Sequence, residues 1–321
     1  MTNIYLSGRF TVNAAIEKAW LKRSGCKYRC FSFAVVNPEK IKGMPTSAKV
    51  VEALKVCETK KVKIMMDSGA YSLHVFQRAQ AKRTANAKVK QAIDINALQQ
   101  QMFDGYVKYC LANKDKWEFY VTLDFKTDQN IIMDMQKKFL AKGLEPTPVY
   151  HGDSDIDWLR KHKDMGHSFI CIGGARLHPG KHGLRYYFDK VFNYGAKHNL
   201  EYHGLAFTSL DIITSYPFKS VDSSTWSQTA AYGMVLLPDF RRGKFLNFHV
   251  SSRRSSNKNT HHDMSKKQKD YMIELFKQHG FDLKAMHDSE VERHDWNGYL
   301  MSNLDKFGVK LDIKNTWENL L

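Results

Sequence analysis

The chain has 321 residues, of which 43% are hydrophobic and 26% charged, so it has apolar material for a sizeable core and is not a disordered protein. Lysine and arginine outnumber aspartate and glutamate by 49 to 33, which gives a formal net charge of +16 at pH 7. A positive excess of this size attracts polyanions and favours nucleic acid as a partner, with a merely solvated basic surface as the alternative.

Membrane and secretion signals are missing from the sequence. No apolar run approaches the roughly 18 residues that a membrane span needs, and the opening residues lack the basic and then apolar segments of a secretion signal. The five cysteines are an odd number thinly spread, which is atypical of a disulfide framework. We therefore expect a cytoplasmic protein that does not bind membranes.

Short apolar runs recur along the chain, separated by segments with helical periodicity, and each run is typical of a buried strand. In chain order, the predicted strands are Ile4–Leu6, Tyr28–Val36, Val62–Met66, Glu118–Leu123, Thr147–Tyr150, Phe169–Ile172, Tyr202–Phe207 and Met234–Leu237. Apolar residues three or four apart predict one buried stripe per helix. These stripes are Leu98, Met102, Tyr106 and Tyr109; Ile132, Met135 and Phe139; and Leu184, Phe188 and Val191.

Eight strands that alternate with helices indicate an α/β fold with a parallel sheet, and we predict a (β/α)8 TIM-like barrel over residues 1–240. A doubly wound open sheet is the competing architecture, but the GxGxxG and GxxxxGK[ST] loops that usually accompany it do not occur. Residues 241–321 are predicted to form a basic linker and a helical appendage. In that appendage Met272, Leu275 and Phe276 share a helix that begins after Ser265 and ends at Gly280.

Three aspartates follow apolar runs, and the carboxyl ends of the strands are where the active site of such a barrel lies. Asp67 precedes Ser-Gly-Ala-Tyr-Ser, Asp124 follows Val-Thr-Leu, and Asp222 lies in Ser-Val-Asp-Ser-Ser. An aspartate in this setting is also a common turn former or helix cap. Three together favour catalysis, because buried carboxylates are costly unless something pairs or uses them.

A histidine and a glycine pair fall at the same predicted rim. His151 follows Pro-Val-Tyr, although a lone histidine is more often a structural residue. Gly173 and Gly174 follow Phe-Ile-Cys-Ile, which is typical either of a ligand that approaches bare backbone or of a tight turn.

Six short motifs occur in order at these strand ends: Asp-Ser-Gly-Ala-Tyr-Ser (67–72), Thr-Leu-Asp-Phe (122–125), Pro-Val-Tyr-His-Gly (148–152), Ile-Gly-Gly-Ala (172–175), His-Gly-Leu-Ala (203–206) and Ser-Val-Asp-Ser-Ser (220–224). Their order resembles the queuine and archaeosine tRNA-guanine transglycosylase superfamily. It looks closest to the branch of DpdA-like DNA-guanine transglycosylases, which place 7-deazaguanines in phage or bacterial DNA. The resemblance covers residues 60–240, about half of the chain.

The resemblance implies a role for each matching residue. Asp222 corresponds to the nucleophile, and Asp67 to the aspartate that assists proton transfer and orientation around the sugar. Asp124 corresponds to the residue that hydrogen-bonds the purine edge. The base pocket is completed by backbone donors at Gly173 and Gly174, by Tyr71, and by His151 in place of the usual glutamine.

The implied reaction exchanges guanine for a 7-deazaguanine such as preQ0 through a covalent aspartyl-deoxyribose intermediate. The 7-deazaguanine is a co-substrate, and no cofactor or metal is required. Two departures accompany the resemblance: no Cys-x-Cys-x-x-Cys zinc motif follows Cys171, and Asp-Ser-Gly-Ala-Tyr replaces Asp-Ser-Gly-Gly-Phe. The missing zinc module makes DNA a more plausible partner than tRNA. A phage-encoded enzyme would work in the host cytoplasm.

The target guanine must be flipped out of a duplex or taken from a single strand, and phosphate contacts offset that cost. Candidate stacking residues for the extruded base are Tyr71, Phe76 and Trp226, which are otherwise core residues. The predicted nucleic-acid contacts, each alternatively an exposed basic residue, are Arg78, Lys82, Arg83, Lys88, Lys90, Arg241, Arg242, Arg253 and Arg254.

Three other functions fit the same residues. One is a tRNA-guanine transglycosylase without its zinc module, and another is a nucleoside or glycoside hydrolase that uses the carboxylate pair with water as acceptor. The third is a non-catalytic nucleic-acid-binding barrel, which the acidic strand ends disfavour because carboxylates repel a polyanion.

Overall fold

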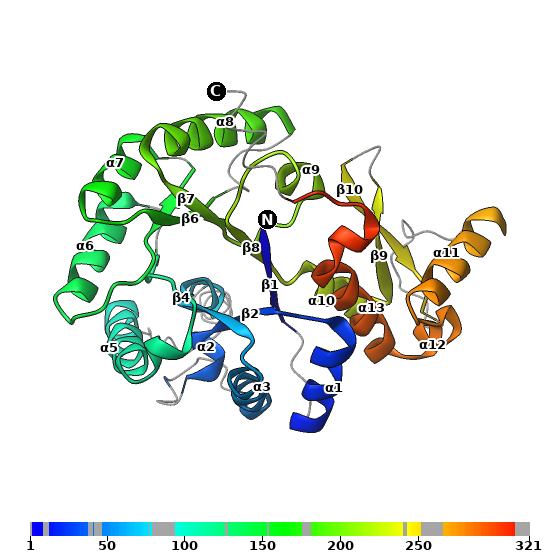
Figure 1. Ribbon diagram of the computed structural model, residues 1–321. Helices are drawn as coiled ribbons and strands as arrows, with labels where there is room; N and C mark the ends of the chain where they lie inside the picture. Colours follow the sequence, from blue (N-terminus) through cyan, green and yellow to red (C-terminus); the bar gives the residue numbers. More distant parts are fainter. Residues whose placement is uncertain are drawn as a thin grey trace, which may run out of the picture.

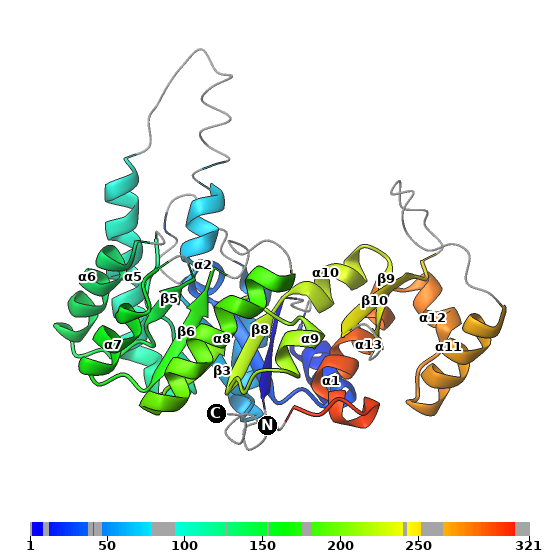
Figure 2. The same cartoon turned by 90° about the horizontal axis from the view of Figure 1, so that it is seen from above.

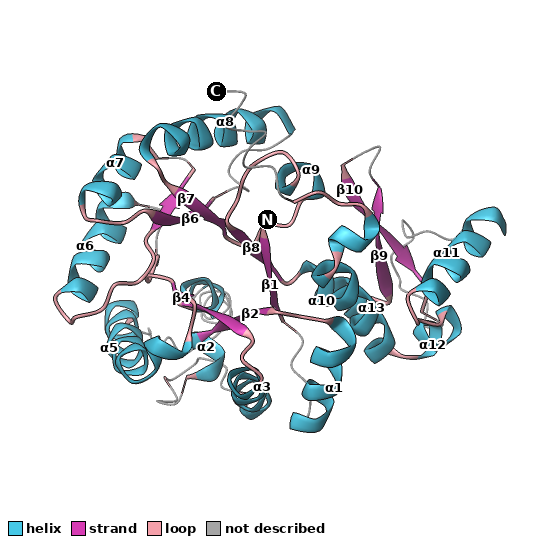
Figure 3. Cartoon of the chain, viewed as in Figure 1, coloured by secondary structure: helices cyan, strands magenta, loops and turns pink. Residues whose placement is uncertain are grey.

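The protein is described from a computed structural model that covers residues 2–8, 13–37, 41, 47–76, 78, 94–125, 128–152, 154–174, 181–239, 243–251 and 266–311. The arrangement is an α/β fold in which a ring of helices surrounds a curled sheet (Figures 1 and 3). None of the helices in these ranges is long and apolar enough to cross a membrane.

Eight parallel strands form the sheet, in the order β4-β3-β2-β1-β8-β7-β6-β5. They are β1 (Asn3–Ser7), β2 (Tyr28–Ser32), β3 (Lys63–Asp67), β4 (Phe119–Tyr120), β5 (Val149–His151), β6 (Phe169–Gly173), β7 (Glu201–Gly204) and β8 (Ser220–Ser223). Beside the two edge strands, a parallel bridge joins Val121 to Thr147, whose N–H donates to the Tyr120 carbonyl at 2.7 Å. The sheet therefore curls until its edges meet, which is compatible with a TIM-like barrel.

Helices connect the strands and cover the outside of the sheet (Figure 1). Asn13, Asp94 and Asp128 cap three of them by accepting hydrogen bonds from first-turn N–H groups. The connecting helices are α1 (Ala14–Ser24), α2 (Phe33–Val36), α3 (Ala48–Thr59), a helix over 70–76, α5 (Ile95–Asn113), η1 (Lys114–Lys116), α6 (Gln129–Leu140), α7 (Asp157–Asp164), α8 (Lys181–His198), α9 (Leu210–Ile213) and α10 (Thr225–Ala231).

Strand residues alternate between the interior of the curled sheet and the helical shell. The pairing register keeps interior residues level, as in Cys30 with Met65 and Cys171 with His203. One buried cluster fills the interior, with Tyr5, Cys30, Met65, Val121, Val149 and Cys171 as its members. The same alternation continues to the carboxyl ends of β3 and β5, so Asp67 and His151, two positions beyond Met65 and Val149, lie at the interior rim.

The carboxyl-terminal part adds a hairpin and helices on one side of the sheet. Its elements are β9 (Met234–Asp239), β10 (Lys244–His249), α11 (Lys266–Gln278), α12 (Leu283–Asp288), α13 (Glu290–Ser302) and η3 (Leu304–Phe307). Helix α13 packs against α1 and α10, whereas α11 and α12 lie at the outer edge in both views (Figures 1 and 2). The hairpin pairs Lys244 with Asp239, so it spans residue 240, where the sequence places the domain boundary.

Most of the predicted elements are confirmed. Strands lie at seven of the eight predicted runs in the barrel order, and the apolar stripes on α5, α6 and α8 face the core, with Tyr109, Met135 and Leu184 half-buried at its edge. Met272 and Phe276 are buried on α11, and Gly280 follows it with a positive φ of 76°. Ser265, the predicted cap of that helix, lies outside the described residues.

Two strand predictions are wrong. The run Tyr28–Val36 is a strand only to Ser32, after which Phe33–Val36 forms helix α2 with its apolar side chains still in the core. The run Met234–Leu237 is β9, which pairs antiparallel with β10 and is not part of the curled sheet. The eighth strand is instead Ser220–Ser223, which carries a single apolar residue, Val221.

Candidate active site

The three predicted aspartates come together at the carboxyl ends of the strands. Asp67 ends β3, Asp222 lies on β8, and Asp124 follows β4 in the connection to α6. In Figure 2 the amino terminus lies at the lower edge and β1 rises from it, so this rim faces the upper edge. The negative charges of Asp124 and Asp222 both act on Asp67. The three aspartates are therefore close together in the folded chain.

The cluster alters the ionisation of Asp67. Burial, and then the charges of Asp124 and Asp222, raise the pKa of Asp67 to about 7. The Ser32 side chain and the Gly69 N–H, which donates to Asp67 Oδ2 at 3.0 Å, oppose the shift. Gly69 has a φ of 78°, and a Cβ there would lie 2.5 Å from the Ala34 Cβ, so only glycine fits this turn. Asp67 is thus poised to gain or lose a proton near neutral pH.

Asp222 has one carboxylate oxygen held and one left free. Its Oδ1 accepts the Ala206 N–H at 2.8 Å and also lies 3.3 Å from His203 Nε2. Ala206 adopts a φ of 54°, in the left-handed region that a non-glycine residue rarely occupies, and this aims its N–H at the carboxylate. Among the described residues, nothing hydrogen-bonds Oδ2. An oxygen fixed in direction but unoccupied suits a nucleophile.

Asp124 and His151 form a second pair at this rim. His151 Nε2 lies 3.2 Å from Asp124 Oδ2, and the side chains are 10% and 20% exposed. The ring rests against Gly173, where a Cβ would lie 3.0 Å from His151 Nδ1 and Cε1. That Nδ1 is buried and has no hydrogen-bond partner among the described residues. Gly173 therefore makes room for His151, while Gly174, with a φ of 76°, makes the turn that leaves the strand.

The two thiols beneath the carboxylates are not nucleophiles. Burial, together with the charges of Asp222 and Asp67, raises the pKa of both Cys30 and Cys171 well above that of a free thiol. Both are protonated at neutral pH, so the chemistry available at this rim is that of its carboxylates and histidines. Within the described ranges, no three histidine, cysteine or acidic side chains are grouped to hold a metal ion.

The predicted aromatic and basic contacts have different outcomes. Tyr71 lies on the helix over 70–76 and is 70% exposed, Phe76 is half-buried, and Arg78 is exposed. Trp226 cannot stack on a base, because it is buried against Trp20 at 5.6 Å and its indole N–H donates to the Ser7 carbonyl. The remaining predicted basic contacts lie outside the described residues: Lys82, Arg83, Lys88, Lys90, Arg241, Arg242, Arg253 and Arg254.

Two site residues were not predicted from the sequence as individual contributors, His203 and Ala206. Both lie in the His-Gly-Leu-Ala motif, and both contact Asp222 Oδ1. The signal that would have identified His203 is the two-residue alternation of β7, which puts it on the same interior face as Leu205. Ala206 carries no such signal, because its contribution is a backbone N–H.

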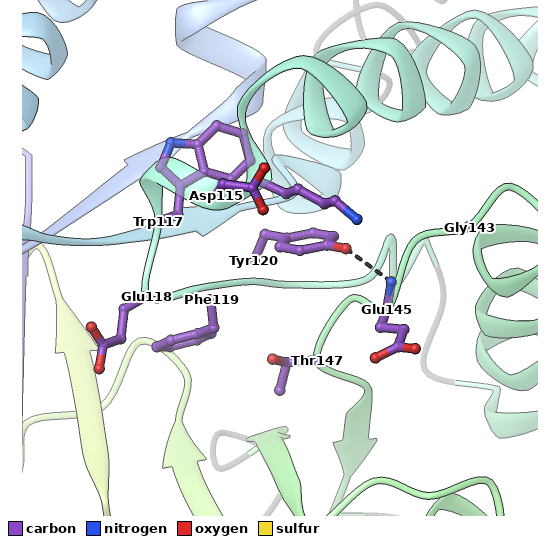
Figure 4. Close-up of a pocket in the computed structure, with 9 residues that line it drawn as sticks. Asp115, Trp117, Glu118, Phe119, Tyr120, Gly143, Glu145 and Thr147 are labelled. Carbon is purple, nitrogen blue, oxygen red and sulfur yellow. Dashed lines mark hydrogen bonds between the residues drawn. The ribbon is translucent and has the colours of Figure 1, made fainter.

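A pocket of about 380 Å³ lies at the opposite end of the sheet (Figure 4). Its lining residues precede or begin β4 and β5, close to the bridge between Val121 and Thr147 that joins the two strands. Tyr120 Oη accepts the Glu145 N–H at 2.9 Å across it. None of the predicted site residues lines this pocket, which is lined by Lys114, Asp115, Trp117, Glu118, Phe119, Tyr120, Gly143, Glu145 and Thr147.

Comparison with known proteins does not assign a family or an activity to this chain. No protein-family model matches the chain, and no curated protein sequence matches it significantly. The activity must therefore be argued from Asp67, Asp124, Asp222 and the residues around them.

Proposed function

We propose that this chain is a transglycosylase that replaces guanine in DNA with a 7-deazaguanine base of the preQ0 type. The observation that carries the proposal is the different state of two neighbouring carboxylates. Asp222 presents one free oxygen, whereas the pKa of Asp67 is raised to about 7. Glycosyl transfer with retention needs such a pair, one group to attack the sugar and one to move protons.

In the first half of the proposed reaction, Asp222 Oδ2 attacks C1′ of a deoxyguanosine. A bond forms between Oδ2 and C1′, and the bond between C1′ and guanine N9 breaks with its electron pair going to the purine. Protonated Asp67 supplies the proton that makes the leaving guanine neutral. The sugar is then held as an ester of Asp222.

In the second half, N9 of the incoming 7-deazaguanine attacks C1′. Its N9 proton passes to Asp67, which has become a carboxylate, and the bond between C1′ and Oδ2 breaks to restore the Asp222 carboxylate. Two inversions give back the original anomer. A pKa near 7 suits Asp67 to both transfers, because it can donate in one half and accept in the other.

The base is recognised, in this proposal, by the Asp124–His151 pair and the Gly173–Gly174 backbone. A purine edge presents both donors and acceptors, and a carboxylate beside an imidazole can meet both kinds. Tyr71 is exposed beside the Asp67 loop and is free to stack on an extruded base.

The choice of DNA rests on charge and on the resemblance noted from the sequence. A net charge of +16 favours a polyanion. The chain lacks the cysteine motif of the tRNA enzymes after Cys171. Arg78, which is exposed seven residues after Tyr71, begins the predicted phosphate-contacting segment.

Mass spectrometry of nucleosides from DNA incubated with the protein and preQ0 tests the proposal. We expect a 7-deaza-2′-deoxyguanosine from DNA and no 7-deazaguanosine from tRNA, and we expect Asp222→Asn to lower exchange by roughly 10⁴-fold or more because the nucleophile is lost. Asp115→Asn, at the opposite end of the sheet, is the matched control and retains exchange.

Each other outcome rejects a particular part of the proposal. Modified tRNA and unmodified DNA would place the protein with the tRNA enzymes. Release of free guanine without incorporation would indicate a hydrolase. Exchange by Asp222→Asn at the wild-type rate would remove Asp222 as the nucleophile.

A further inference from the structure

A buried histidine lies directly beneath the Asp222 carboxylate, on the neighbouring strand. His203 is on β7 and is fully buried, so it cannot touch a substrate. Its Nε2 lies 3.3 Å from Asp222 Oδ1, and its Nδ1 lies 2.7 Å from Ser220 Oγ. The register pairs His203 with Ser220, two residues before Asp222 on β8. Both ring nitrogens are therefore engaged by the strand that carries the proposed nucleophile.

The two partners of the ring, Asp222 and Ser220, fix which nitrogen carries the proton. An ionised carboxylate only accepts hydrogen bonds, so the Nε2 that faces Asp222 must be the donor. In the neutral ring Nδ1 is then the acceptor, and the Ser220 hydroxyl donates to it. The order of donation runs from Ser220 to His203 to Asp222.

Aromatic neighbours hold the ring in this orientation. The Tyr5 and Phe119 rings meet the imidazole edge-on, with centroids at 6.0 Å and 5.2 Å. A ring flip would require both to move, and interiors of this density resist such movement. The site therefore contains a histidine with one tautomer and one orientation.

We propose that His203, oriented by Ser220, is a positioning residue for Asp222: it holds Oδ1 so that Oδ2 alone points to the sugar. This inference rests on the proposed function. When Oδ2 forms its bond to C1′, Oδ1 becomes the carbonyl oxygen of an ester. When that bond breaks, the negative charge returns to the carboxylate, and the His203 and Ala206 N–H groups stabilise it. His203 keeps its proton throughout.

The first test reads the hydrogen bonds without any substrate. Proton–nitrogen NMR of ¹⁵N-histidine-labelled protein reports the tautomer of each ring, with His203 assigned by the signal lost in His203→Gln. We expect a neutral ring with its proton on Nε2. We expect that signal to shift in Asp222→Asn and the tautomer to become mixed in Ser220→Ala. A proton on Nδ1 in the wild type would overturn the inference.

The second test compares variants that keep or remove the donor. His203→Gln retains an N–H that reaches toward Asp222, whereas His203→Leu has similar bulk and no donor. We expect His203→Leu to lower kcat for base exchange by roughly 10²- to 10³-fold, as for loss of one donor to a developing charge. His203→Gln should recover roughly tenfold or more of that loss, and KM for the base should stay unchanged in both.

A serine pair on β8 supplies a matched control and a milder variant. Ser223 lies on the opposite face of β8, where its hydroxyl donates to Thr225 Oγ1 at 2.9 Å. We expect Ser220→Ala to lower kcat by roughly tenfold and Ser223→Ala to leave it within about twofold. If His203→Leu shows no cooperative unfolding transition in a urea titration, it is not folded, and the comparison of Ser220→Ala with Ser223→Ala tests the inference.

The outcomes separate the inference from the proposed function. Equal kcat in wild type, His203→Leu and Ser220→Ala would overturn the positioning role while leaving the transglycosylase intact. Absence of exchange in the wild type, with the Nε2 proton and its dependence on Asp222 present, would overturn the proposed function and leave the Ser220–His203–Asp222 chain established.

Discussion

Asp67 owes its unusual ionisation to three features that the fold brings together. It is the last residue of β3, it faces the interior, and two other carboxylates lie at the same rim. Burial is the largest cause of the raised pKa, followed by the charges of Asp124 and then Asp222. The opposing effects of the Ser32 side chain and the Gly69 N–H do not offset them. The folded protein therefore holds a proton on Asp67 at pH values where the unfolded chain does not.

This difference predicts how stability changes with pH. The pKa of Asp67 is raised from 3.8 to about 7, so between these values the folded state binds more protons than the unfolded state. The contribution of Asp67 to the free energy of unfolding then falls as pH rises from about 4 to 8, and by up to about 4 kcal/mol. We expect Asp67→Asn to flatten that dependence and to be more stable than wild type at pH 8.

Urea titrations at pH 5 and pH 8 measure the effect. Asp115→Asn, outside the carboxylate cluster, should keep the wild-type pH dependence. Asp124→Asn should give an intermediate slope, because it removes the carboxylate whose charge raises the pKa of Asp67 more than that of Asp222 does. Identical slopes for wild type and Asp67→Asn would show that the folded state does not raise the pKa of Asp67.

Asp67 and Asp124 could be identified from the sequence because each follows an apolar run, and the ends of such runs converge in a barrel. Asp222 follows only Val221, and its place in the ordered motifs indicated it. The pKa of Asp67 could not be identified, since it depends on distances between residues 57 and 155 positions apart in the chain (124 − 67 and 222 − 67). His203 escapes sequence-based prediction for a related reason. The alternation along β7 indicates that its side chain faces the interior, but its contact with Asp222 follows only from the pairing of β7 with β8.

At the scale of elements, the register between β5 and β6 decides the geometry of the base-recognising pair. The register places His151 opposite Gly173, and the missing side chain at Gly173 is what allows the imidazole to reach Asp124. A Cβ at Gly173 would lie 3.0 Å from two ring atoms, tighter than ordinary contact. The strand pairing and the Asp124–His151 hydrogen bond are thus coupled.

We expect Gly173→Ala to lower the free energy of unfolding by about 1–3 kcal/mol, because the new methyl group displaces the His151 ring in a packed interior. The added cost should largely disappear in a His151→Ala background, where the ring is absent. A double-mutant cycle from urea denaturation measures this coupling. If Gly173→Ala cost the same with and without His151, the ring would not be what requires glycine here.

Apolar runs predicted most strands, and the exceptions have physical causes. β8 reads Ser-Val-Asp-Ser and is fully buried, because it lines the polar rim on one side and packs through Val221 on the other. Its composition does not look like that of a strand. Met234–Leu237 does, and it is one, but its partner β10 lies only a few residues further on and pairs with it as a hairpin. Hydrophobicity therefore identifies an apolar strand such as β9, but it does not indicate the sheet to which the strand belongs.

For the whole molecule, the carboxyl-terminal elements are joined to the curled sheet through a buried amide. Asn297 on α13 accepts the Leu236 N–H at 2.8 Å and donates to the Trp226 carbonyl at 3.0 Å. Trp296 beside it donates to the Leu236 carbonyl and is itself fully buried. At the other end of the chain, the Thr2 N–H donates to the Leu311 carbonyl at 3.1 Å. These contacts link β9, α10 and β1 to segments beyond residue 240.

Truncation at residue 240 tests whether the predicted barrel folds without the carboxyl-terminal elements. The fragment would lose β10 and α13, leaving Val235 and Leu237 exposed and the Leu236 and Trp226 backbone groups without their Asn297 partner. Unpaired buried polar groups and exposed apolar surface each cost about 1–3 kcal/mol, and small domains have only about 5–15 kcal/mol to lose. We expect residues 1–240 to show no cooperative urea transition by circular dichroism, while the full chain unfolds in one step. A sharp transition in the fragment, with dispersed amide signals, would instead establish residues 1–240 as a domain that folds alone.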